Sequence, residues 1–299
     1  MGRLCQNRKS VTMDSNLPLK SAVEGFAKLT YPCSEGDLER PWVWGSYDEE
    51  GIRFAFFRIY EELRQLASEL EAARLAAKKP ISKAQRALAQ YHSAFRDLEV
   101  ILLGYDDGQL NQPPAEGQWS LRQILLHSIE ADMGFFFVIR RALDGARNIG
   151  KPVVPLSDEG WQAFWAGDRF DALRESGSVS KLLRYYAKHH NWVLNEFASI
   201  DNTELALPSE YWEDEPMNVQ FRLHRFDAHL RQHTIQAEKT LVAIGLGPGE
   251  PRRLLRMVYN ALAEVEGMQI GAPEVGIESS QALAEEITTL TREIEELLA

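Results

Sequence analysis

Two histidines, spaced four residues apart, are the side chains most suited to chemistry in this sequence. They are His229 and His233, within 226-FDAHLRQHTIQAEKT-240. Four residues correspond to about 400° of helix rotation, so both imidazoles point the same way, one turn apart. That spacing lets two ring nitrogens reach one metal ion, although such a pair is more often two hydrogen-bonded core histidines. It is not the HExxH motif of zincins, because Leu230 occupies the position of the catalytic glutamate.

A third histidine favours the metal interpretation. His127 ends the stretch 119-WSLRQILLH-127, in a segment that is apolar nearly all round and is therefore expected to be a buried helix. A buried histidine needs a partner for each ring nitrogen. Three histidines facing a bundle interior can meet that need through one divalent transition metal. Three protein ligands leave positions open for water or substrate, which is typical of a catalytic site.

The stretches that carry these histidines resemble the signatures of a known family. The run 119-WSLRQILLHSIEAD-132, after a PP-x-x-G loop, resembles the second-helix signature of the DinB-like (DinB/YfiT) metalloenzyme superfamily. The run 229-HLRQHTIQ-236 resembles its fourth-helix signature. The resemblance covers about residues 83–246 and implies a four-helix bundle that holds one divalent metal. The ligands it implies, carried over by position, are His127, His229 and His233.

The same resemblance implies a class of reaction. Better-understood members of the family use bacillithiol, mycothiol, glutathione or related thiols in transfer or isomerisation, and a metal-bound thiolate is a strong nucleophile at neutral pH. We therefore expect a thiol-dependent transferase or hydrolase with a small-molecule substrate. The expected cofactor is a divalent transition metal, with zinc, nickel and iron as candidates, because histidine-rich sites accept several ions. The alternatives are a metal-binding or scaffold protein without turnover, and a structural helical protein that binds no metal.

Two polar residues near the histidines are candidates for supporting roles. Glu130 lies one turn past His127 and can serve as a hydrogen-bond acceptor or a fourth ligand; its alternative is a surface charge. Gln236 follows His233 by three residues and can face the site, or can be an ordinary polar residue at the edge of the core. Asp132 is a weaker candidate of the same kind as Glu130.

The remaining histidines are not expected to join the site. His189 and His190 are adjacent, so they point about 100° apart, at most one can face inward, and we interpret them as a helix-surface pair. His224 is expected to be exposed, and His92 has no assigned role.

Composition excludes several classes of protein. The 299 residues are 44% hydrophobic and 26% charged, the profile of a soluble globular chain. The net charge of −11 disfavours binding to nucleic acid or anionic membrane, because both require clustered lysine and arginine. There is no apolar run long enough to span a bilayer. The two cysteines, Cys5 and Cys33, are expected to be reduced, which fits a cytoplasmic protein.

Helical periodicity dominates the chain, so the expected fold class is all-α. We expect a tail and aromatic lead-in over residues 1–48 (with Met13 as a second candidate start), an N-terminal helix over 49–80, the DinB-like bundle over 83–246, and a C-terminal helical extension over 250–299. Within the bundle, Ser120 and Gln123 form a capping-box pattern that predicts a helix start. The long connection over 144–177 carries Trp161 and Trp165, either as part of a binding loop or as its anchor.

Two apolar stripes with 4-3-4-3 spacing lie near the two ends of the chain. Such stripes pack either on one another or across a homodimer, or each covers the central bundle separately. They are Ile59, Leu63, Leu66, Leu70 and Ala73, and Leu283, Ile287, Leu290, Ile294 and Leu297.

Overall fold

The computed structural model describes residues 17–48, 50–150, 158–211, 213 and 215–299. Residues 1–16, with Cys5 and Met13, lie outside the described residues. The fold is all-α, as expected, with one short two-stranded sheet. The helices are α1 (Leu17–Thr30), α2 (Glu35–Leu38), α3 (Arg53–Ala76), α4 (Lys83–Ile101), α5 (Asp107–Asn111), α6 (Leu121–Asp144), α7 (Asp158–Phe164), α8 (Phe170–Ser176), α9 (Val179–Phe197), α10 (Val219–Ala243), α11 (Glu250–Gln269) and α12 (Ile277–Leu298). A π-helical turn, Gly145–Ile149, extends α6, a 3-10 turn spans Glu204–Ala206, and strand β1 (Pro208–Ser209) pairs antiparallel with β2 (Met217–Asn218).

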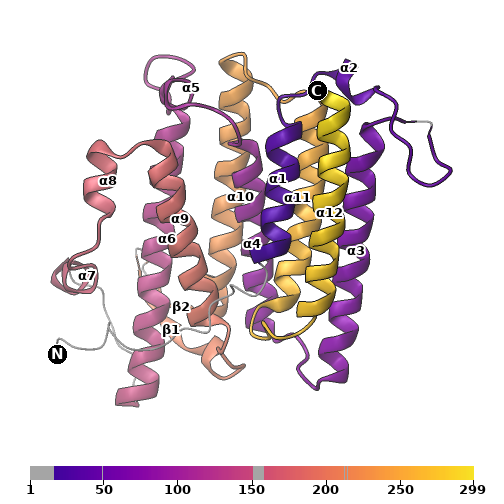
Figure 1. Cartoon of the computed structure of the whole chain (residues 1–299). Coiled ribbons are helices and arrows are strands. Elements are labelled where there is room, and N and C mark those ends of the chain that lie inside the picture. Colours follow the sequence, from indigo (N-terminus) through magenta and orange to yellow (C-terminus); the bar gives the residue numbers. More distant parts are fainter. Residues whose placement is uncertain (1–16, 49, 151–157, 212, 214) are drawn as a thin grey trace.

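Four helices form the first bundle. Helix α10 packs against α4 and α6, and α9 packs against the same two helices (Figure 1). Each helix turns its apolar face inward, so the four share one continuous core. All four helices lie within residues 83–246, the segment expected from the sequence to form the bundle. Among the described helices, none combines the length and the hydropathy needed to cross a membrane.

The terminal helices form a second bundle with a core of its own. Helices α1, α3, α11 and α12 stand side by side in the other half of the molecule (Figure 1). The two apolar stripes both face this core: Leu63 and Leu70 of α3 are buried, as are Ile287 and Ile294 of α12. The stripes therefore meet within one chain, although α12 packs mainly on α1 and α3 mainly on α11.

Helix α1 lies in the segment expected to be a tail and lead-in. Val23 and Phe26 are fully buried in the second core. The helix is only 14 residues long and contains Gly25, so its intrinsic helix signal is weak. Packing against α12 and α11 supplies the stability that the local sequence lacks.

The connection after α6 is anchored by its aromatic residues. It contains α7 and α8 rather than an extended loop. The Trp161 ring lies 5.4 Å from that of Phe137, and the Trp165 ring lies 6.2 Å from that of Phe136. Both phenylalanines belong to α6. The anchoring interpretation of the two tryptophans is therefore the one that fits the structure.

Adjacent histidines on α9 are buried, and the expectation of a surface pair is wrong. His189 is 4% exposed and His190 is 1% exposed. The His190 ring stacks on that of Phe95 of α4, with centroids 4.0 Å apart. His189 turns the other way, where Trp165 covers it at 5.9 Å. The two side chains point about 100° apart, yet both are buried. His190 faces the bundle, and the segment after α7 covers the side of α9 on which His189 lies.

A buried ion pair joins the two bundles. Arg96 of α4 donates two hydrogen bonds to Glu266 of α11, at 2.7 and 2.5 Å. A ring nitrogen of His92, a residue without an expected role, lies 2.8 Å from the same carboxylate, and its other nitrogen lies 2.8 Å from His190. Burial raises the pKa of Glu266, but the charge of Arg96 and the contact with His92 outweigh it, so that this pKa falls to about 2. The carboxylate is therefore ionised and fully paired.

We predict that Glu266→Gln destabilises the protein by about 3–5 kcal/mol, because Arg96 loses its principal buried counter-charge. Urea unfolding followed by circular dichroism measures the change. The matched control is Glu264→Gln, two residues away on the same helix, where an exposed ion pair with Arg64 contributes at most about 1 kcal/mol. Equal effects of the two substitutions would contradict the importance assigned to the buried pair.

Candidate metal centre

The start of α6 places His127. The Ser120 hydroxyl accepts a hydrogen bond from the Gln123 backbone N–H at 3.3 Å, and the Gln123 side chain accepts one from the Ser120 N–H at 2.9 Å. This is the predicted capping box, and it is confirmed. It fixes the first turn of the helix, so that His127, about two turns from the start, faces α10.

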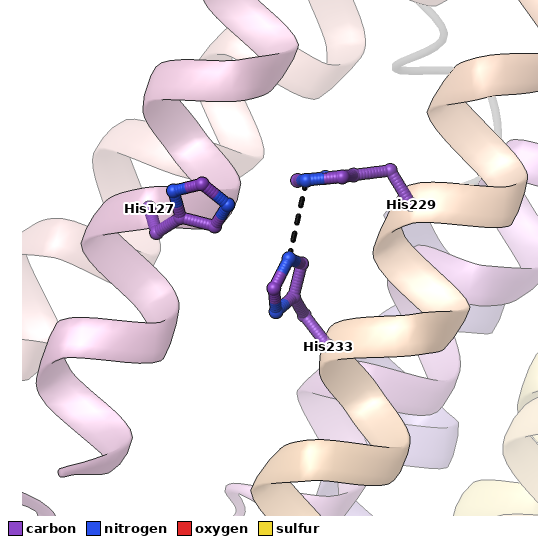
Figure 2. A group of neighbouring side chains, drawn as sticks. All are labelled: His127, His229 and His233. Atoms are coloured by element: carbon purple, nitrogen blue, oxygen red, sulfur yellow. Dashed lines mark hydrogen bonds between the residues drawn. The ribbon is translucent and has the colours of Figure 1, made fainter. Parts of the chain in front are cut away.

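The two histidines of α10 face the same space from the opposite side. Figure 2 shows the rings of His229 and His233 one turn apart and directed toward His127 across the gap between the helices. The Nε2 atoms of His229 and His233 are 3.1 Å apart. One ring nitrogen from each of the three histidines lies within 4.8 Å of the others. In the described parts of the chain, this is the only group of three or more His, Cys, Asp or Glu side chains so arranged.

This spacing fits a metal ion. A tetrahedral zinc with bonds of about 2.0–2.1 Å to nitrogen separates two ligand nitrogens by about 3.3 Å. The observed 3.1 Å between His229 and His233 is close to that value, and a nitrogen of His127 lies within 4.8 Å of both. The donor set is three imidazoles, which suits zinc, nickel or iron better than magnesium or calcium.

The histidines are held in the form that binds metals. Burial lowers the pKa of His229 to about 3, and the neighbouring His233, His127 and Arg225 add to the effect. Burial also lowers the pKa of His233. Both rings are therefore neutral at pH 7, with a lone pair on one nitrogen. A metal ion that binds these two rings would not have to displace a proton from an imidazolium, so its affinity should depend little on pH near neutrality.

Gln236 determines which nitrogen of His233 is free. Its Oε1 atom lies 2.9 Å from Nδ1 of His233. The ring donates its Nδ1–H to this oxygen, which leaves the Nε2 lone pair directed toward His229. Of the two placements considered for Gln236, the observed one is contact with His233. His229 has no such support, since its buried Nδ1 has no hydrogen-bond partner among the described residues.

The two acidic candidates, Glu130 and Asp132, lie in different surroundings. Glu130 is exposed and forms an ion pair with Arg174 at 2.7 Å, which matches the alternative of a surface charge. Asp132 is fully buried, and its Oδ2 accepts hydrogen bonds from the hydroxyls of Tyr91 and Tyr186, both at 2.6 Å. Neither tyrosine is a sequence candidate, because their approach to Asp132 requires α4, α6 and α9 to meet.

The two sides of the histidine cluster differ in access to solvent. On the inner side the Phe135 ring lies 5.7 Å from that of His229 and 5.5 Å from that of Phe226. On the outer side the ring of Trp119, which is 41% exposed, lies 5.1 Å from that of His127. His127 itself is half-buried. The cluster is therefore bordered by phenylalanine toward the core and by a partly exposed tryptophan on its outer side.

One part of the chain matches a known protein family. Residues 90–237 match the family model described as the DinB superfamily. The matched segment spans most of α4, all of α6 and α9 and most of α10, and it contains all three histidines of the cluster. No curated protein and no solved structure matches the chain.

We predict that Asp132 makes stability depend on pH. Burial raises the pKa of this carboxyl from 3.8 to about 7, against the opposing hydrogen bonds from Tyr186 and Tyr91. The unfolded chain ionises near pH 4 while the folded protein keeps its proton until near pH 7, so stability falls as pH rises across that interval. At about 1.4 kcal/mol per pKa unit, the loss is on the order of 4 kcal/mol. Denaturant unfolding from pH 4 to 8, with chelator present, measures it.

Asp132→Asn removes this carboxyl at nearly constant shape. The fall in unfolding free energy between pH 4 and pH 7 should therefore be smaller in the variant than in the wild type. The control is Asp171→Asn on the exposed face of α8, which should retain the fall of the wild type. Parallel pH profiles for the wild type and Asp132→Asn would contradict the raised pKa.

Proposed function

The chain is DinB-like over residues 90–237, and on this premise we propose that it is a divalent-metal-dependent enzyme that carries out thiol-dependent transfer or hydrolysis on a small molecule. The observation that carries the proposal is the cluster of His127, His229 and His233, in which three ring nitrogens converge without a fourth His, Cys, Asp or Glu ligand in the described residues. Three ligands with open positions are typical of catalytic rather than structural metal sites.

Bound metal would supply a lowered pKa for a coordinated water or thiol, and with it a nucleophile at neutral pH. The chain's own residues support such chemistry. Gln236 orients His233 through Nδ1. Phe135 borders the cluster toward the core and limits water on that side. The half-buried His127, beside the exposed Trp119, is the side from which we expect a small molecule to enter.

Cys33, the one cysteine among the described residues, is not suited to supply the thiol for the reaction. Cys33 follows α1 in the second bundle, outside the DinB-like segment. Burial and the nearby charge of Asp37 raise the pKa of its thiol, so that little thiolate is present at pH 7. This favours a low-molecular-weight thiol as co-substrate, as the family resemblance implies.

We predict about one divalent metal per chain in protein purified without chelator or a histidine tag, measured by elemental analysis. His229→Ala should lose most of this metal, because two imidazoles hold an ion far less tightly than three. The matched control is His224→Ala, an exposed histidine on the same helix. A wild type with no more metal than the His127→Ala/His229→Ala/His233→Ala triple variant would eliminate both the enzymatic proposal and the alternative of a metal-binding scaffold.

A graded variant tests the same centre without removing a ligand. Gln236→Ala should weaken metal binding by roughly 10–100-fold, since the ring of His233 loses its orienting partner. Gln232→Ala, exposed on the same helix, should bind as the wild type does. Equal affinities for both variants would show that the contact of Gln236 with His233 does not orient the ligand.

We further predict that metal-loaded protein binds a thiol saturably at the cluster. A cobalt-substituted sample titrated with bacillithiol, mycothiol and glutathione should develop a thiolate-to-metal absorption band with one of them, whereas the triple histidine variant should not. Turnover is then tested with electrophilic small molecules and the thiol that binds. Metal at full occupancy with no thiol binding and no turnover would support the scaffold alternative instead.

A further inference from the structure

We propose that a cleft between the two bundles binds a primary amine that carries an apolar group. The cleft has a volume of about 500 Å³, within the usual range for small-molecule sites. None of its lining residues belongs to the histidine cluster. Its walls come from α1, the end of α4, α5, the start of α9, and α11.

The walls of the cleft are suited to an apolar group. Leu102, Leu110 and Val179 are buried, and Leu103 and Leu183 are half-buried. They come from three different elements, so the apolar surface wraps around the cleft rather than forming a flat patch. An alkyl or phenyl group placed there would remove this surface from water at about 25 cal/mol per Å².

The hydroxyl of a mostly buried tyrosine opens into the cleft. Tyr259 of α11 is 4% exposed and lines the cleft, and no hydrogen bond joins its hydroxyl to any described residue. A tyrosine hydroxyl ordinarily has a hydrogen-bond partner, and for one that faces a cleft the partner is water or a ligand. Its oxygen is therefore available to accept a hydrogen bond from a ligand, and its O–H to donate one.

Acidic side chains near this hydroxyl make the cleft favourable for a cation. Glu99 is half-buried and shares Arg96 with Glu266, so these three groups retain one net negative charge. Glu24, also half-buried, pairs with Lys20 through one carboxylate oxygen. Burial raises the pKa of the Tyr259 hydroxyl, and the charges of Glu99 and Glu24 add to this while that of Arg96 opposes it. Glu24, Glu99 and Tyr259 all line this one cleft.

The rim adds to the negative charge. Asp106 and Asp107 are exposed and use one oxygen each to cap backbone N–H groups, at Gln109 and Val179. The only basic residue in the lining is Lys28, which is exposed and keeps its ammonium in water. A carboxylate or phosphate would meet this negative field, whereas an ammonium would be attracted by it.

The proposed ligand follows from these groups. A primary ammonium has three N–H donors, which match the oxygen of Tyr259 and the remaining oxygens of Glu24 and Glu99. The apolar part of the molecule then lies against the leucines. A quaternary ammonium carries the charge without the donors, so it should bind more weakly than a primary amine of the same size.

Calorimetric titration of the full chain tests this proposal with a matched set of probes. We expect 2-phenylethylamine to bind saturably with a dissociation constant of about 1 mM or below. The neutral 2-phenylethanol, the anionic 3-phenylpropionate and the quaternary N,N,N-trimethyl-2-phenylethylammonium should each bind at least about tenfold more weakly. Equal binding of the amine and the anion, or no binding of the amine, would overturn the proposal.

Variants locate the binding in the cleft. Glu99→Gln should weaken amine binding at least about tenfold and Tyr259→Phe about fivefold. Tyr60→Phe and Glu264→Gln, in the same bundle but outside the cleft, should have no effect. Ser180→Lys adds a cation on an exposed lining position where folding is not at risk, and it should abolish binding. Unchanged affinity in Glu99→Gln and Ser180→Lys would place the amine elsewhere, and dependence on His229 would assign it to the histidine cluster instead.

Discussion

The ion pair between Arg96 and Glu266 is the interaction on which the two halves of this protein depend. It is buried on both sides and links α4 of the first bundle to α11 of the second. A buried guanidinium or carboxylate is costly unless it is paired, so the pair holds the two bundles in one register. His92 extends it to His190, which places α9 against α4. The position of α4 is thus determined from both bundles at once.

The histidine cluster depends on that arrangement indirectly. Helix α4 packs along α10, which carries His229 and His233, and α9 packs along α6, which carries His127. Asp132 adds a direct link, since its carboxyl receives hydrogen bonds from tyrosines of α4 and α9. The three histidines are therefore held on rigid helices whose mutual positions are set by buried polar contacts, and such preorganisation is what a metal site would require.

The second bundle gives the protein more than a covering layer. It has its own core, and its junction with the first bundle creates a cleft that neither bundle would have alone. Glu99 contributes to both features, because it pairs with Arg96 at the seam and lines the cleft. The segment that matches the DinB superfamily contains part of the cleft wall, but α1 and α11, with Glu24 and Tyr259, lie outside it.

The sequence by itself determined the features that arise from local periodicity and spacing. The 3.6-residue repeat predicts the bundle helices, the Ser120–Gln123 pattern predicts the start of α6, and a four-residue interval places His229 beside His233. These predictions succeed because a helix converts sequence distance into spatial distance without reference to the rest of the chain.

Only the tertiary structure decided what depends on contacts between distant segments. It buried both His189 and His190, because a helix face is exposed or covered according to what packs on it. It distinguished Gln236, which contacts His233, from Glu130, which pairs with Arg174 at the surface, although their spacings from a histidine are equal. It formed α1 from a weak helical sequence and joined Asp132 to two tyrosines. In each case the deciding energy comes from burial and pairing across helices, which no local pattern contains.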